Sequence, residues 1–360
     1  MSPQGRAEAS TALPDRRGRT SYAGFRSVIK AVGSGPRGSR ALTFDEARGA
    51  TASLLAGEVS PVQAGAFLVA MRIKGETPPE LAGVAQALRD AARSIAPDRP
   101  SGGQAGGRPI LACAGAFDGM CEAPHLSLAA AVIAAAAGAR IVVPCGSTLG
   151  PKFGTTPADV LAALGGPVRP DPVQSLAMLE RAGVALVHAG AAIPGWDALA
   201  AVRDEIGLRG PVHSAEKLVD HLGATHFVVG HTHSSYRDRI LGALTLLGAP
   251  RAVAVRGMEG TDILRAGRPS AADVDGPLDI PESAGSVLRG DADPQVAAEL
   301  TRAIVDRDEH GIAAHTATLS AGLRLYVAGR CESVAAGAAA ASDAVADGRA
   351  TATLAALLAA

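Results

Sequence analysis

Residues 110–145, ILACAGAFDGMCEAPHLSLAAAVIAAAAGARIVVPC, decide the fold of this chain. They begin with a short apolar segment that ends at Gly115, continue through an alanine-rich stretch, and finish with a second apolar segment, 140–145. Short apolar runs bounded by glycine are typical of buried strands, and the alanine-rich stretch between them predicts a helix. A strand, a helix and a strand in this order predict a crossover unit with two parallel strands.

The same alternation continues toward the C-terminus. Further strand candidates share a short apolar core and are residues 184–190, 225–231 and 251–257. Helical segments lie between them, among them 157–166 and 236–248, and the tail from about Pro294 is helical. This pattern predicts a large α/β domain over residues 108–360 with a mostly parallel sheet.

The part of the chain before this region has helical signals only. Thr43 can cap a helix, and Glu46 three residues later completes a capping box. We expect a small all-helical domain over residues 21–100, joined to the α/β domain through the glycine-rich stretch 101–109. The polar residues 1–20 are expected to form a disordered tail.

Composition excludes several classes of protein. The 360 residues carry 34 basic and 35 acidic side chains, so a globally basic nucleic-acid binder is excluded. Aromatic residues make up only 3%, too few for a surface that stacks many bases. The four cysteines form no CxxC pair, which fits a reducing cytoplasm. The longest apolar run is broken by Gly138 and Arg140, and we expect no membrane span.

Ligands of open parallel sheets bind beyond the carboxyl ends of the strands, so the loops at these ends are the candidate site. The first loop, 114–120, places Gly115, Asp118 and Gly119 before a helix, which suits a phosphate or forms a plain turn. The second, 144–159, holds Gly146, Ser147 and Lys152. The chain has only four lysines, so a lysine at a strand end indicates a phosphate-binding charge, with a surface loop as the alternative.

Three later loops complete the candidate set. Residues 210–221 bring His213 and Lys217. The His231-x-His233 pair lacks a nearby third ligand, so pocket lining is a better interpretation than zinc binding. Glu259 and Asp262 follow the strand 251–257 and could hold magnesium, unless they are solvated turn acids. Together these loops predict a site for a phosphorylated sugar.

Residues 42–92 resemble the N-terminal helical region of anthranilate phosphoribosyltransferase and its relatives, most specifically in GEVSPVQAGAFLVAMRIKGETP (57–78). The stretches PADVLAALGG (157–166), AVRDEIG (201–207) and AGRCESVAAGAAAASDAVADGRA (328–350) are similar to that family as well. The resemblance covers about residues 27–360. It implies a fold of the nucleoside phosphorylase and phosphoribosyltransferase type, phosphoribosyl diphosphate as donor, Mg²⁺, a role in tryptophan biosynthesis, and a homodimer formed through the helical domain.

The motifs of the donor site depart from the family pattern. The diphosphate loop GTGGD is here AGAFDGM, and NIST is HLSL, with His125 in place of asparagine and Ser127 kept. KHGNR is VPCGSTLG, which keeps only Gly146. The magnesium-holding Asp-Glu pair is Asp262-Ile263. This resemblance is therefore to a divergent branch.

The resemblance also suggests how the candidate residues divide between two substrates. Lys152, Ser127, Asp118 and Asp262 would serve the donor. His125, Arg203 and His213 would face the acceptor, and Arg203 matches the arginine expected near an aromatic acid.

The predicted function is transfer of phosphoribosyl to a nitrogen of a small acceptor, with aromatic acceptors included. One alternative is a non-catalytic member of the family that binds nucleic acid through a dimer groove, since residues 1–45 hold eight basic and three acidic side chains. A nucleoside phosphorylase-like activity is a further alternative.

Overall fold

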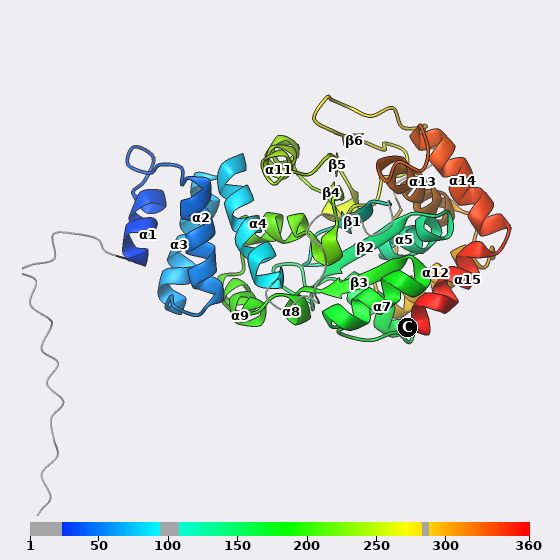
Figure 1. The fold of residues 1–360 in the computed structure, drawn as a ribbon, viewed down its shortest axis with the longest axis horizontal. Coiled ribbons are helices and arrows are strands. Elements are labelled where there is room, and N and C mark those ends of the chain that lie inside the picture. The colour runs from blue at the N-terminus through cyan, green and yellow to red at the C-terminus, as the bar shows by residue number, and fades with distance from the viewer. Residues whose placement is uncertain (1–23, 94–107, 283–287) are drawn as a thin grey trace, which may run out of the picture.

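The computed structural model describes residues 24–93, 108–282 and 288–360. A group of helices at the N-terminal end lies beside a larger α/β body (Figure 1). These N-terminal helices are α1 (Phe25–Gly33), α2 (Phe44–Leu55), α3 (Pro61–Lys74) and α4 (Pro78–Arg93). The predicted fold class is thereby confirmed. The expected tail, residues 1–20, and most of the glycine-rich joint lie outside the described residues.

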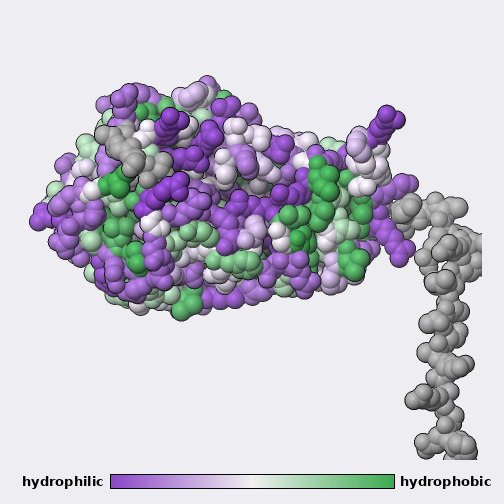
Figure 2. All heavy atoms as spheres, turned by 180° about the vertical axis from the view of Figure 1, so that it is seen from behind, coloured by the Kyte–Doolittle hydropathy of each residue, from purple (hydrophilic) through white to green (hydrophobic). Residues whose placement is uncertain are grey.

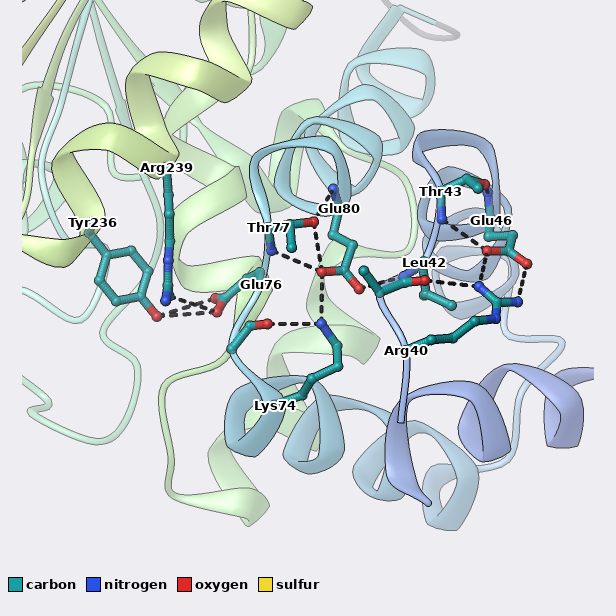
Figure 3. Close-up of polar contacts among 12 residues, drawn as sticks. Arg40, Leu42, Thr43, Glu46, Lys74, Glu76, Thr77, Glu80, Tyr236 and Arg239 are labelled. Atoms are coloured by element: carbon teal, nitrogen blue, oxygen red, sulfur yellow. Dashed lines mark hydrogen bonds and ion pairs between the residues drawn. The ribbon is translucent and has the colours of Figure 1, made fainter. Parts of the chain in front are cut away.

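The expected capping box at the start of α2 is present. The Glu46 backbone N–H donates to the Thr43 hydroxyl at 3.2 Å, and the Thr43 backbone N–H donates to the Glu46 carboxylate at 2.9 Å. These two bonds satisfy N–H groups that the helix itself leaves without a partner. Arg40 adds an ion pair to Glu46, which Figure 3 shows beside the cap.

A fully buried carboxylate ties the helical bundle together. Glu80, in the first turn of α4, accepts from Lys74 Nζ at 2.8 Å and from the backbone N–H of Leu42 at 2.7 Å. The backbone N–H and the hydroxyl of Thr77 donate to the same carboxylate (Figure 3). Because buried charges are costly unless they are paired and hydrogen-bonded, these partners explain how Glu80 is tolerated there.

The body is built on one sheet with the strand order β3-β2-β1-β4-β5-β6. Its parallel strands are β1 (Ile110–Ala114), β2 (Arg140–Cys145), β3 (Val184–His188), β4 (His226–Gly230) and β5 (Arg251–Val255). Each falls within a segment predicted as a strand. The sixth strand, β6 (Ala271–Ala272), pairs antiparallel with β5 and was not predicted, because two residues give no periodic signal.

Helices cover the sheet. The alanine-rich stretch forms α5 (Ser127–Ala136), whose residues 127–134 are all buried between the sheet and the C-terminal helices. Those helices, together on the right of Figure 1, are α12 (Pro294–Val305), α13 (Ile312–Val327), α14 (Val334–Ala346) and α15 (Arg349–Leu358). Gly322 and Gly337 let α13 and α14 approach closely, because a Cβ atom at either position would overlap the other helix.

The remaining helices are α6 (Pro157–Ala163), α7 (Pro172–Ala182), α8 (Ala189–Ala192), α9 (Trp196–Ile206), α10 (Pro211–Ala215) and α11 (Ser235–Leu246). The last three pack against the helical domain. Arg89 of α4 donates to the Leu218 carbonyl oxygen. Glu76, after α3, accepts from Tyr236 of α11 at 3.3 Å (Figure 3).

Over the described ranges, no helix has both the length and the apolar character that crossing a membrane requires.

Candidate functional site

A cleft of about 630 Å³ opens where the parallel strands end, next to the helical domain. Its walls come from the loops after β1, β2, β4 and β5, from the segment between α9 and β4, and from α3 and α11. The charged residues in this lining are Arg72, Asp118, Lys152, Arg209 and Lys217. Four cations thus face one carboxylate, and two of the chain's four lysines are among them.

The single carboxylate of the lining is already neutralised. Asp118 is fully buried, Arg209 Nε donates to its Oδ2 at 2.8 Å, and Arg209 Nη2 lies at an ion-pair distance of 2.6 Å from the same oxygen. Its Oδ1 atom is buried without a hydrogen-bond partner. Arg72, from the last turn of α3, donates to the carbonyl oxygen of Arg209 and so links the helical domain to this corner of the cleft.

Lys152 contacts Glu259, which belongs to the loop that follows β5. Its Nζ lies 3.1 Å from Glu259 Oε2, and the Glu259 carboxylate also accepts from the backbone N–H groups of Cys121 and Glu122. Burial raises the pKa of Glu259, but the two N–H groups and Lys152 outweigh burial and hold the pKa below its usual value. Glu259 is therefore ionised and fully engaged.

Two glycines shape the loops at this end of the sheet. Gly119 has a φ of 76°. A Cβ atom at this position would overlap the backbone of Gly154, which packs directly against Gly119. This approach joins the loops after β1 and β2, because Met120 and Thr155 exchange backbone hydrogen bonds of 2.9 and 2.8 Å. A Cβ atom at Gly115 would lie 3.0 Å from Thr261 Cα. Both glycines serve close backbone packing under the cleft.

Lys217 enters the cleft from the short helical segment before β4. It is buried, and its Nζ donates to the carbonyl oxygen of Gly230 at 2.7 Å. Burial lowers the pKa of Lys217 to about 8, against the attraction of Glu216. Burial also lowers the pKa values of His213 and His231, so these two imidazoles are neutral at pH 7 and the positive charge comes from lysine and arginine.

Arg203 is fixed inside the protein. Its Nη2 lies 2.9 Å from Glu216 Oε2, an ion-pair distance without the alignment of a hydrogen bond, and its guanidinium stacks 4.9 Å from the Trp196 ring. Burial raises the pKa of Glu216 to about 7, and Arg203 opposes that rise. Arg203 does not line the cleft, but it lines a hollow of about 10 Å³ beside it, which has room for about one water molecule.

Asp262 lies beneath the cleft and is fully buried. Ser127 Oγ donates to its Oδ1 at 2.7 Å, and Arg324 Nη2 donates to its Oδ2. Arg324 also donates to the Ser127 carbonyl oxygen at 2.8 Å. Neither Asp262 nor Ser127 is part of the cleft lining.

This environment does not fit magnesium. Both oxygens of Asp262 are engaged by protein groups, the next residue is the buried Ile263, and Glu259 is engaged as well. In the parts of the chain that the structure describes, no three His, Cys, Asp or Glu side chains are placed to hold a metal ion. The residues assigned to the metal from sequence thus bind other partners.

The other sequence-assigned residues lie outside the lining. His125 is buried, accepts from the Ser127 N–H at 3.4 Å, and leaves its Nε2 without a partner. Ser147, beside the buried Gly146, lies 3.0 Å from His188 Nε2. The cleft lining therefore includes four of the assigned residues, namely Asp118, Lys152, His213 and Lys217.

Among the lining residues that the sequence did not assign to the site are Arg72, Tyr236 and Arg209. Arg72 and Tyr236 belong to helices that showed only core periodicity, and their place in the cleft depends on how the domains dock. Arg209 directly precedes the 210–221 loop, and an arginine in that position was a usable signal.

A helical bundle docked on an α/β body, with a cationic cleft at the strand ends, defines a class of transferases. The glycosyl transferase family model for the helical bundle domain matches residues 26–92, and that for the a/b domain matches residues 122–351. The anthranilate phosphoribosyltransferase of Thermus thermophilus is 32% identical over 317 residues, which cover 86% of this chain and 92% of that protein. That of Methylobacterium sp. (strain 4-46) is 33% identical over 354 residues, covering 93% and 98%.

Solved structures agree with these matches. The crystal structure of anthranilate phosphoribosyltransferase from Thermus thermophilus superposes with a TM-score of 0.79 at 30% identity, covering 93% of this chain and 98% of that chain. The Saccharomyces cerevisiae enzyme in complex with phosphoribosyl diphosphate and Mg has a TM-score of 0.76 at 15% identity, over 93% and 96% of the two chains, and supports the fold. The chain belongs to the anthranilate phosphoribosyltransferase family of glycosyl transferases.

Proposed function

We propose that this protein transfers a phosphoribosyl group from phosphoribosyl diphosphate to a nitrogen atom of a small acceptor. The observation that carries the proposal is the cleft, in which four Lys and Arg side chains face one neutralised carboxylate. Diphosphate carries several negative charges, and its departure from the sugar is favoured by fixed cations in a partly enclosed site. Family membership supports the same reaction class.

The donor diphosphate is proposed to lie between Lys152, Arg209 and Lys217, which line the cleft together. Catalysis would then consist of positioning and charge neutralisation, as the C–O bond to the diphosphate breaks and the acceptor nitrogen bonds to the same carbon. The acceptor would lie toward the helical domain, where Tyr236 and Arg72 complete the wall.

Asp118 remains a donor-site residue in this proposal, and His213 faces the acceptor, as the sequence suggests. Arg203, His125, Ser127 and Ser147 would act only through neighbours, because none of them lines the cleft. Any magnesium in the reaction would arrive on the diphosphate of the donor, since the protein's own carboxylates are engaged.

Calorimetry with phosphoribosyl diphosphate, with Mg²⁺ present, tests the proposal. The wild-type protein is expected to bind the donor, and Lys152→Ala and Lys217→Met are expected to bind it at least tenfold more weakly. Arg349→Ala, an exposed arginine on α15 paired with Asp347, removes one positive charge away from the cleft and is the control. Absence of donor binding by the wild type would overturn the proposal.

Acceptors are then screened by diphosphate release, with anthranilate as the first candidate. The related proteins and structures described above give no support to the two alternatives, nucleic-acid binding and a nucleoside phosphorylase-like activity. Release of diphosphate that depends on an aromatic amine, and is lost in Lys152→Ala, is the expected result.

We also propose that the protein is a homodimer formed through the helical domain. Val62 and Ile73 of α3 are 83% and 81% exposed. Apolar groups gather at that end of the molecule in Figure 2. Apolar clusters of this kind mark contact surfaces between proteins.

A further inference from the structure

The buried carboxylate of Asp262 has a protein cation as its partner. Arg324, on α13, is also fully buried and reaches Asp262 Oδ2 with Nη2. The same guanidinium donates to Ser127 Oγ at 3.0 Å and to the Ser127 carbonyl oxygen at 2.8 Å, while Ser127 Oγ donates to Asp262 Oδ1 at 2.7 Å. These three residues form a closed set of hydrogen bonds, hereafter the Arg324 cluster.

The described residues around the Arg324 cluster offer no second carboxylate to a cation. The residue after Asp262 is Ile263, which is fully buried and has no oxygen in its side chain. Glu259, three residues before Asp262, is bound to two backbone N–H groups and to Lys152. Magnesium prefers an octahedral set of oxygen ligands, and each oxygen of these two carboxylates already accepts from a protein donor.

The cleft above the Arg324 cluster carries its own positive charge. Lys152 lines it from the loop after β2, and Arg209 and Lys217 line it from the segment between α9 and β4. Arg209 is paired with Asp118 and Lys152 with Glu259. Lys217 donates to a backbone carbonyl and has protons left for a ligand, since an ammonium group has three donors. Lys and Arg together can neutralise a diphosphate in the absence of a metal ion.

We propose that Arg324 permanently takes the place of a divalent cation at Asp262, and that the cleft binds its diphosphate ligand through Lys152, Arg209 and Lys217 without requiring a metal ion. The identity of the ligand rests on the proposed function. The replacement is stable because opening the Arg324 cluster would leave a buried charge without a partner.

The experiment compares ligand binding with and without metal. Inorganic diphosphate and phosphoribosyl diphosphate are each titrated calorimetrically into the wild-type protein, once in chelator and once in excess Mg²⁺. We expect the dissociation constant of each ligand to agree within about threefold between the two conditions. Mn²⁺ is titrated separately into the ligand-free protein and followed by electron paramagnetic resonance, where no saturable binding is expected.

The outcomes separate this inference from the proposed function. Binding of both ligands only in Mg²⁺, or stoichiometric binding of Mn²⁺ to the free protein, would overturn the inference and leave the proposed function standing. Metal-independent binding of diphosphate without binding of phosphoribosyl diphosphate would support the inference and overturn the proposed function. If neither ligand binds with or without Mg²⁺, the inference and the proposed function are both overturned.

A pair of variants tests the role of Arg324 itself. Arg324→Met combined with Ile263→Glu removes the guanidinium and adds a second carboxylate, so it is expected to gain saturable Mn²⁺ binding. Arg324→Lys keeps a cation beside Asp262 and is expected to bind no Mn²⁺. A folded double variant that binds no Mn²⁺ would count against the inference. If the double variant does not fold, the titrations of the wild-type protein with and without metal test the inference by themselves.

Discussion

Lys217 Nζ donates a 2.7 Å hydrogen bond to the carbonyl oxygen of Gly230, the last residue of β4. This bond fixes a buried ammonium group at the carboxyl end of a strand in the centre of the sheet. Lys217 therefore presents a positive charge to the cleft from a fixed position. A charge fixed in this way costs little further ordering when an anion binds.

The first prediction is that binding of anions to the cleft weakens above about pH 8. Burial lowers the pKa of Lys217 to about 8 from its ordinary 10.5, so the side chain is charged below that pH and loses its charge as the pH rises through it. Calorimetry with inorganic diphosphate across this range measures the effect. Lys217→Met should bind at least tenfold more weakly at pH 7 and lose this pH dependence. An unchanged pH profile in this variant would contradict the assignment.

The second prediction concerns the buried pair of Arg203 and Glu216. Glu216→Gln leaves the Arg203 guanidinium buried without a counter-charge, and we expect a loss of about 3–5 kcal/mol in the free energy of unfolding, measured by denaturant titration above pH 7, where Glu216 is ionised. Asp347→Asn breaks an exposed pair with Arg349 and is the matched control, with little measurable change expected. Equal losses in the two variants would contradict a structural role for Arg203.

The third prediction compares two glycines. Gly119→Ala places a side chain at a φ of 76° and against the Gly154 backbone, so we expect the free energy of unfolding to fall by about 1–3 kcal/mol or more. Gly49→Ala, within α2, meets no atom within 4 Å and should stabilise the protein by about 0.4–1 kcal/mol. Thermal unfolding monitored by circular dichroism distinguishes the two directions.

Most of the fold could be predicted from the sequence because its signals are local. The capping box of Thr43 and Glu46 and the apolar strand segments each depend on residues that are close in the chain. Strand β6 depends on pairing with a distant segment, and its two residues carry no pattern of their own. The sequence therefore predicted the parallel sheet and missed its short antiparallel edge.

The candidate site could be predicted only in part, for the same reason. Strand ends can be located from the sequence, which led to Lys152 and Lys217 in the cleft. The role of Asp262 depends on Arg324, which lies 62 residues later in the chain on a helix with no visible signal of a buried ion pair. Arg72 reaches the cleft only because the helical domain docks beside it.

The fourth prediction is that the helical domain holds two copies of the chain together. Val62→Glu with Ile73→Glu places two charges on the exposed apolar face of α3, and burying those charges in a contact would be costly, so the variant should be a monomer. Light scattering after gel filtration measures the mass of each form. Val168→Glu alters a valine that is 72% exposed on the α/β body and should remain dimeric. A monomeric wild type, or a dimeric double variant, would show that this face is not the contact.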